Sequence, residues 1–239
     1  MEPGPVTRSQ LARLAREWKQ GEHVLVSGPT KSGKTTLARH IVQLRIDRGG
    51  HVVVFCMKPL SDPTIVNEYK GWDRWQKWKR RVTRDDRQIL LWPDVSKARG
   101  NRRDILDIQK EVFQQAIDHI NSIGRWTVQI DEGLYMTAPD FLGMSGDLAM
   151  GQAIGRSGDL TYVTLTQRPA HLPLLVYGSA SHAFVGRTRE LADQKRLSEL
   201  GAKEGSRALA NRISQLGRHE FVWVPVATDW DSETVNMER

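Results

Sequence analysis

Residues 28–36 read Gly28-Pro29-Thr30-Lys31-Ser32-Gly33-Lys34-Thr35-Thr36. They match the phosphate-binding pattern G-x-x-x-x-G-K-[ST], and they lie between an apolar run at 23–27 and a helical pattern from Leu37. Two glycines let backbone N–H groups turn toward a polyphosphate, and the next helix adds its positive N-terminal end. We expect all nine residues to bind ATP, with Lys34 on the β- and γ-phosphates and Thr35 on Mg²⁺. The alternative, a glycine turn with a solvated lysine, fits this strand-before, helix-after context poorly.

The length and composition indicate a protein that can bury a full hydrophobic core. The chain has 239 residues, 39% of them hydrophobic and 26% charged, which is typical of a soluble globular protein. No apolar run approaches the length of a membrane span, and the N-terminus shows no secretory pattern. The one cysteine, Cys56, excludes an intrachain disulfide framework. We therefore expect a cytoplasmic protein without a membrane segment.

The positive charge is concentrated in one segment. The whole chain has a net charge of +7, whereas residues 70–103 hold twelve Lys and Arg against four Asp, so this segment nets +8 and the remainder −1. Such a local excess favours a polyanionic partner such as DNA, whose phosphates Lys and Arg neutralise without reading sequence. The alternatives are a solvated face and a subunit interface.

Strand-like and helix-like segments alternate along the chain. Buried strands are predicted at 23–27, 51–56, 88–92, 126–130, 160–165, 181–185 and 221–225. Helices are predicted at 7–20, 37–48, 104–122, 148–156, 190–200 and 204–216. This order predicts one α/β domain over residues 1–239, with a mostly parallel sheet flanked by helices. The last strand ends the sheet or begins a hairpin.

Residues 63–103 form a basic insertion with an aromatic repeat. Tyr69, Trp72, Trp75 and Trp78 recur every three residues, which predicts a stripe that drifts around a helix. Such a stripe favours packing on the core or on a neighbouring subunit. The alternative is that the tryptophans stack on the bases of single-stranded DNA.

Two further motifs complete a hydrolytic site. Asp131 and Glu132 end the apolar strand 126–130, about 100 residues after the phosphate loop. Asp131 suits an Mg²⁺ anchor, and Glu132 suits a base that orients and deprotonates water. Kinases of small molecules do not need such a base, so the pair favours hydrolysis. Gln167, after the strand 160–165, suits a sensor of the γ-phosphate, although spacing alone also allows an ordinary turn before Pro169.

These motifs resemble the FtsK/HerA group of P-loop ATPases. The resemblance lies in the loop 28–36, in Ile130-Asp131-Glu132, in Leu165-Thr166-Gln167-Arg168-Pro169 and in Met57-Lys58-Pro59. It covers roughly residues 23–62 and 124–225. It implies a RecA-like fold, ATP and Mg²⁺ as cofactors, and a homo-oligomeric ring, usually a hexamer, with duplex DNA in its pore.

The resemblance also implies residue roles. Lys34, Glu132 and Gln167 would be catalytic, and Thr35 and Asp131 would hold the metal. Arg156 stands just before the Gln-bearing strand, where related motors carry an arginine that projects into the neighbouring subunit's ATP. Arg187 and Arg189 are rivals for that role, and Arg156 could instead be an ordinary helix-terminal residue.

The chain departs from the group in two ways. Lys31 replaces a glycine that the group often has, and no membrane region or DNA-sequence-reading domain accompanies the motor. A bare motor of this kind would suit a virus or a mobile element. Three hypotheses therefore follow: a ring-shaped ATP-driven DNA translocase or packaging motor, a non-motor P-loop enzyme such as a small-molecule kinase, and a nucleotide-switched binding module. The strand end Thr166–Pro169 and the basic insertion favour the first, and the Asp131-Glu132 pair argues against the second.

Overall fold

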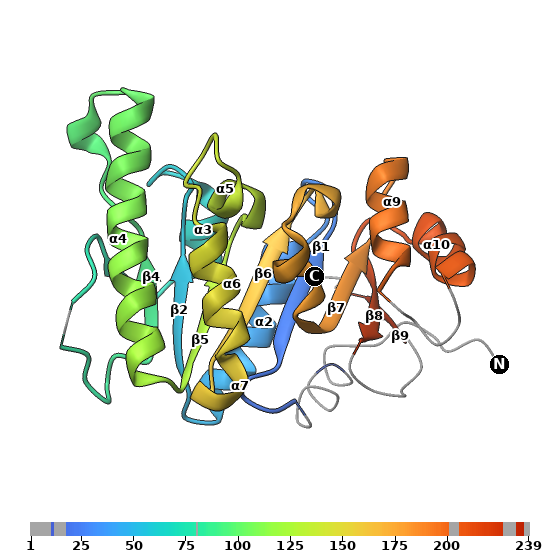
Figure 1. Cartoon of the computed structure of the whole chain (residues 1–239), viewed down its shortest axis with the longest axis horizontal. Coiled ribbons are helices and arrows are strands. Elements are labelled where there is room, and N and C mark those ends of the chain that lie inside the picture. The colour runs from blue at the N-terminus through green and yellow to red at the C-terminus, as the bar shows by residue number, and fades with distance from the viewer. Residues whose placement is uncertain (1–10, 12–17, 80, 201–205, 227–232, 237–239) are drawn as a thin grey trace.

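The computed structural model describes residue 11 and residues 18–79, 81–200, 206–226 and 233–236. Within these ranges, nine strands form one sheet in the order β3-β4-β2-β5-β6-β1-β7-β8-β9 (Figure 1). The strands are β1 (His23–Ser27), β2 (His51–Phe55), β3 (Asp73–Trp75), β4 (Gln88–Leu91), β5 (Trp126–Ile130), β6 (Thr161–Thr166), β7 (Ala180–Gly186), β8 (Glu220–Pro225) and β9 (Glu233–Asn236).

The sheet is parallel from β3 through β7 in this spatial order. The two last strands, β8 and β9, pair antiparallel and form a C-terminal hairpin on the β7 edge. The predicted α/β fold with a mostly parallel sheet and a terminal hairpin is therefore confirmed.

Helices cover both faces of the sheet (Figure 1). They are α2 (Lys34–Asp47), α3 (Pro63–Glu68), α4 (Arg102–Ile123), α5 (Gly133–Thr137), α6 (Ser145–Ala153), α7 (Gly155–Gly158), α8 (Leu174–Gly178), α9 (Leu191–Ser198) and α10 (Ser206–Gln215), with short 3₁₀ turns η1 (Ser96–Ala98) and η2 (Pro169–His171). None of the helices in the described ranges combines the length and the apolar character that crossing a bilayer requires.

Two core layers explain why the strands are apolar throughout. Val52 and Val54 of β2 pack with α2 on one face, whereas Val53 and Phe55 pack with α4 on the other. Successive side chains of a strand point to opposite faces, so a strand covered on both sides is apolar at every position. The continuous apolar runs in the sequence are a direct consequence of this two-sided burial.

The strand order determines where the site forms. β5, β6 and β1 are neighbours, although 98 residues (28–125) separate β1 from β5 in the chain. All three are parallel, so their carboxyl ends lie at the same edge of the sheet. The phosphate loop follows β1, Asp131 and Glu132 follow β5, and Gln167 follows β6. The fold thus brings three distant motifs to one edge, where α/β proteins commonly bind ligands.

The structure corrects the prediction of a helix through the aromatic repeat. α3 ends at Glu68, Gly71 takes a left-handed conformation (φ +83°), and Trp75 belongs to strand β3. Trp72 packs in the α2-side core and Trp75 and Trp78 pack in the α4-side core, so the three rings do not form one stripe. The rings are only 3–7% exposed, which excludes base stacking and confirms the prediction that they pack in the core.

The predicted helix at 7–20 falls largely outside the described residues. At Trp18–Gln20, where the description resumes, the chain is not helical. Gly21 (φ +92°) then makes the turn into β1, and the Trp18 ring stacks on His182 of β7 with the ring centroids 4.4 Å apart. The chain just before β1 is therefore held against the β7 side of the sheet.

Candidate functional site

The phosphate loop borders a hollow at the carboxyl edge of the sheet. This hollow measures about 690 Å³ and is lined by Thr30–Thr36, Lys58, Asp62, Thr64, Asp131, Glu132, Gln167, Arg218 and His219. Gly33 has a left-handed backbone (φ +93°) that glycine adopts without strain, and the chain enters α2 directly after it. Lys31 also has a positive φ (+63°), a conformation that favours glycine and that accounts for the glycine expected at this position.

Two of the nine predicted loop residues do not line the hollow. The Gly28 N–H donates to the Thr166 carbonyl of β6 (3.2 Å), so it continues the sheet. The Pro29 carbonyl accepts a hydrogen bond from Lys34 Nζ (2.9 Å). Lys34 is buried, and this burial lowers the pKa of its ammonium to about 8. A bound polyphosphate would offer this ammonium the negative partner that its surroundings provide only in part.

The two threonines after Lys34, Thr35 and Thr36, make different contacts. The Thr36 hydroxyl donates to Glu68 Oε1 at the end of α3 (2.6 Å), so it ties two helices together. Thr35 lines the hollow as well, without this bond to Glu68. Its hydroxyl is the one that the phosphate-binding motif would place on a metal ion.

Asp131 is a second oxygen group that could hold such an ion. Its carboxylate is buried, and no hydrogen-bond donor in the described part of the chain satisfies Oδ1. Burial raises the pKa of Asp131, and the nearby Lys58 ammonium opposes that rise. A hydroxyl and a carboxylate are the hard oxygen ligands that Mg²⁺ prefers, so Thr35 and Asp131 fit this ion.

Gln167 connects the loop to Glu132. Its amide oxygen accepts a hydrogen bond from the Thr30 hydroxyl (2.6 Å), and its amide nitrogen donates to Glu132 Oε2 (3.1 Å). Burial raises the pKa of Glu132, while the bond from Gln167 lowers it. The structure therefore brings together the three elements that the sequence separates, and Gln167 stands between the loop and the predicted base.

The residues beside Gln167 anchor the end of β6. Arg168 Nε lies 3.0 Å from Asp193 Oδ2 of α9, and the Ala170 N–H donates to the other oxygen of Asp193 (2.9 Å). The Asp193 side chain is only 1% exposed, so this ion pair joins the end of β6 to the buried side of α9. Arg168 is thereby directed away from the hollow while Gln167 faces into it.

Sequence reasoning missed the far wall of the hollow. Arg218 and His219 come from the turn before β8, and His219 Nδ1 lies 3.3 Å from the Ser32 carbonyl oxygen of the loop. Because β8 runs antiparallel to β7, its first residue lies at the carboxyl edge of the parallel strands. A positively charged residue before an apolar strand matches no sequence motif, so these two residues can be assigned to the hollow only from the arrangement of the strands.

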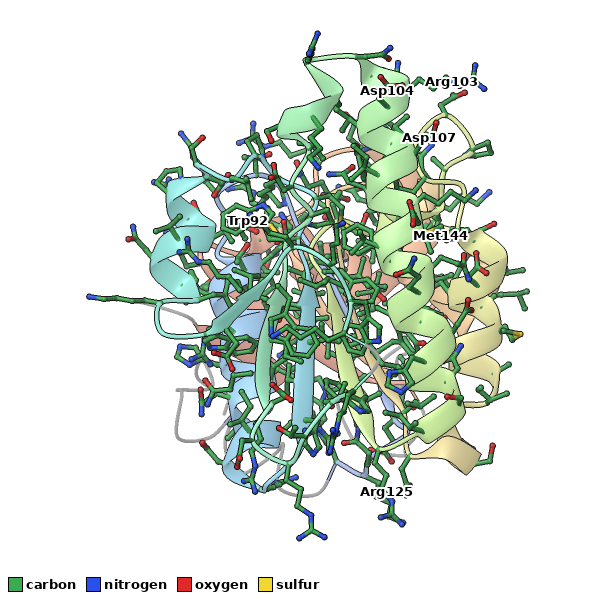
Figure 2. All side chains as sticks on the ribbon, turned by 90° about the vertical axis from the view of Figure 1, so that its left-hand side faces the viewer. Trp92, Arg103, Asp104, Asp107, Arg125 and Met144 are labelled. Atoms are coloured by element: carbon green, nitrogen blue, oxygen red, sulfur yellow. The ribbon has the colours of Figure 1, made fainter. Side chains whose placement is uncertain are left out.

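Arg156 lies at the opposite edge of the sheet. It belongs to α7, which precedes β6 and lies at the lower end of the sheet in Figure 1. It is exposed and borders a separate hollow of about 990 Å³ together with Arg48 and Arg125. Arg125 projects from the same lower end in Figure 2, far from Arg103 at the upper end. Arg156 therefore cannot serve the phosphate loop of its own chain.

The rival arginines lie at the carboxyl edge. Arg187 and Arg189 follow β7, and both are exposed. They do not line the hollow beside the phosphate loop. Exposed arginines therefore lie at both edges of the sheet, Arg156 at one edge and Arg187 and Arg189 at the other.

No protein-family model matches the sequence, and no curated protein matches it either. Solved structures do match. B204, the DNA-packaging ATPase of Sulfolobus turreted icosahedral virus, superposes with a TM-score of 0.64 at 17% identity, over 93% of this chain and 100% of B204. The chain is similar in fold to a viral packaging ATPase. VirB4 of Thermoanaerobacter pseudethanolicus also matches (TM-score 0.63, 9% identity, 91% and 89% covered).

The pCW3 conjugation coupling protein TcpA matches as well, with a TM-score of 0.55 at 14% identity, over 91% of this chain and 60% of TcpA. At such identities these likenesses concern the fold. They confirm a RecA-like P-loop architecture of the kind that the FtsK/HerA resemblance implied.

Proposed function

We propose that this protein hydrolyses ATP and uses the energy to move DNA, as a ring-shaped packaging or translocation motor. One observation carries the proposal: Gln167 is hydrogen-bonded to Thr30 of the phosphate loop and to Glu132 at the end of β5. A group in this position changes its partners when a γ-phosphate arrives or leaves. Solved structures of the B204 packaging NTPase that are similar in fold hold ATP-γS and AMPPCP, which supports ATP as the nucleotide.

The residues of the hollow divide the chemistry among them. Backbone N–H groups of the loop and the Lys34 ammonium bind the phosphates and neutralise their charge. Thr35 and Asp131 would hold Mg²⁺, which supplies a Lewis acid for the phosphoryl oxygens. Glu132 accepts the proton of the attacking water, and burial, which raises its pKa, makes it a stronger base than an exposed glutamate.

The ring would complete the site from the neighbouring subunit. Arg156 is exposed at the edge opposite to its own loop, so it could reach an ATP only across a subunit boundary. An arginine in that role accelerates phosphoryl transfer by about 10³–10⁵-fold. A homohexamer, the usual assembly of the group that the sequence resembles, would provide such boundaries around a central pore.

The DNA would contact the exposed cations of segment 70–103. Every described Lys and Arg of this segment is exposed, whereas its tryptophans are buried. Arg84 and Arg87 precede β4, and Lys97 and Arg99 follow it, so the cations extend along the outer edge of the sheet from end to end. An arrangement of this kind suits phosphates of duplex DNA and not base recognition.

The test compares ATP hydrolysis with and without duplex DNA at low salt, in the wild type and in Glu132→Gln. We expect DNA to stimulate the wild type, the stimulation to fall steeply with salt, and Glu132→Gln to bind ATP without hydrolysing it. Hydrolysis that is indifferent to DNA would refute the motor and favour a non-motor NTPase. Mixing Arg156→Ala subunits into wild-type rings should reduce the rate more than in proportion, and Arg187→Ala and Arg189→Ala provide the matched comparison.

A further inference from the structure

Lys58 and Asp131 form an ion pair inside the hollow. Lys58 follows β2, and its Nζ lies 3.1 Å from Asp131 Oδ2. The side chain of Asp131 is 1% exposed and that of Lys58 is 35% exposed, so the carboxylate is fixed in the interior while the ammonium reaches it from the solvent side. Neither carboxylate oxygen has another hydrogen-bond donor in the described part of the chain. Lys58 is therefore the cation that neutralises Asp131.

The backbone around Lys58 is held by hydrogen bonds from two neighbouring side chains, whereas the Lys58 side chain is held at its ammonium by Asp131. The Trp92 indole N–H donates to the Lys58 carbonyl (2.7 Å), and the Gln109 amide donates to the Met57 carbonyl (3.3 Å). Figure 2 shows Trp92 at the upper part of the sheet, and its side chain is buried. The half-exposed lysine stem can thus change direction without any movement of the main chain.

A divalent metal needs the same carboxylate. An Mg²⁺ ion held by Asp131 and Thr35 would lie beside the Lys58 ammonium, and two cations on one carboxylate repel each other. Two other acids line the hollow: Asp62 already accepts the Ile65 N–H as the N-cap of α3, and Glu132 accepts a hydrogen bond from the Gln167 amide. A bound polyphosphate would carry more negative charge than either, so it is the partner toward which a displaced Lys58 would turn.

We propose that Lys58 and the divalent metal compete for Asp131, and that Lys58 moves to the phosphates when the metal–nucleotide complex binds. This inference rests on the proposed nucleotide site. Lys58 is then a positioning residue with two effects of opposite sign. It weakens binding of the metal alone, and it strengthens binding of the metal–nucleotide complex.

The experiment measures thermal unfolding in EDTA and in millimolar Mg²⁺, without nucleotide or DNA. We expect Mg²⁺ to shift the wild-type midpoint little and to stabilise Lys58→Met clearly, with a metal affinity raised roughly tenfold. The double variant Lys58→Met/Asp131→Asn should lose the Mg²⁺ response. Lys31→Met removes another exposed lysine from the same hollow and serves as the control for charge alone. Equal Mg²⁺ responses in the wild type and Lys58→Met would overturn the proposal.

A second measurement separates positioning from a merely structural role. The affinity of Lys58→Met for Mg·ATP should fall, while its affinity for Mg²⁺ alone rises; a variant that is simply less well folded would lose both, which would refute the proposal. If Lys58→Met folds only when Mg²⁺ is added, that dependence supports the competition, and failure to fold in both conditions while the double variant folds overturns it. Because the first readout uses no ATP and no DNA, it does not depend on whether the protein is a motor.

Discussion

Replacing Gln167 with alanine is expected to move the acid limb of the ATPase pH profile to higher pH. Glu132 has to be ionised to accept a proton from water. Burial raises the pKa of Glu132, and the hydrogen bond from the Gln167 amide (3.1 Å) lowers it by stabilising the carboxylate. Removal of this donor leaves the effect of burial opposed only by the Lys34 charge and by the backbone N–H of residue 167. The pKa of Glu132 therefore rises, and a larger fraction of the base is protonated at any pH below it.

The size of the shift follows from the strength of that hydrogen bond. A hydrogen bond to a charged group contributes about 1.5–3 kcal/mol, and one pKa unit corresponds to about 1.4 kcal/mol. Since Gln167 is exposed, water replaces part of the lost bond and the lower end of the range applies. We expect a shift of about one pH unit.

The assay is kcat/KM for ATP against pH, because this ratio reports the ionisation of the free enzyme. Thr30→Val is the matched control: it removes the hydroxyl that donates to the Gln167 oxygen but leaves the amide that reaches Glu132. Its acid limb should move much less than that of Gln167→Ala. A rate that falls equally at every pH in Gln167→Ala, with the acid limb unmoved, would refute the reasoning.

Three further predictions concern Arg218 and Lys34, which line the hollow, and His23, which is buried in the core. Arg218→Ala should weaken ATP binding about tenfold and AMP binding less, because it removes a cation from the wall of the phosphate hollow; Arg207→Ala is the exposed control, and unchanged ATP binding would contradict this. ATP affinity should fall as pH rises through the Lys34 pKa of about 8, and calorimetry showing constant affinity would count against it. Burial lowers the pKa of His23 below 6.5, so the unfolded chain takes up the proton at a higher pH than the folded chain, and stability is lost as the pH falls below 6.5. His23→Gln should therefore reduce the pH dependence of the urea unfolding midpoint, whereas His171→Gln, at an exposed histidine, should not.

The local sequence predicts the elements of this fold better than their order in space. Buried strands such as β1 and β5 are evident because two-sided burial requires apolar residues at every position. That β6 lies between β5 and β1 is not encoded in any short segment. Proximity of Gln167 to Glu132 therefore follows from long-range packing, and in the sequence it rested on a resemblance to other ATPases.

The aromatic repeat shows where a periodic pattern misleads. A three-residue spacing is close to the helical period, yet Gly71 breaks the helix and Trp75 enters a strand. The rings pack in two core layers, Trp72 on one face of the sheet and Trp75 and Trp78 on the other. Arg218 was missed for the complementary reason, since an isolated cation in a turn has no pattern at all.

The end of β6 links the chemistry to the rest of the molecule. The Thr166 carbonyl accepts the Gly28 N–H, Gln167 contacts Thr30 and Glu132, and Arg168 pairs with the buried Asp193 of α9. These three consecutive residues therefore contact the phosphate loop, the Glu132 carboxylate and helix α9, which lies outside the hollow. Gln167 is the exposed member of the set, and its two hydrogen bonds involve side chains. If the protein is the proposed motor, arrival or loss of a γ-phosphate would rearrange Gln167 while its neighbours stay fixed, and Gln167 would be the residue of this hollow best placed to couple the nucleotide state to movement.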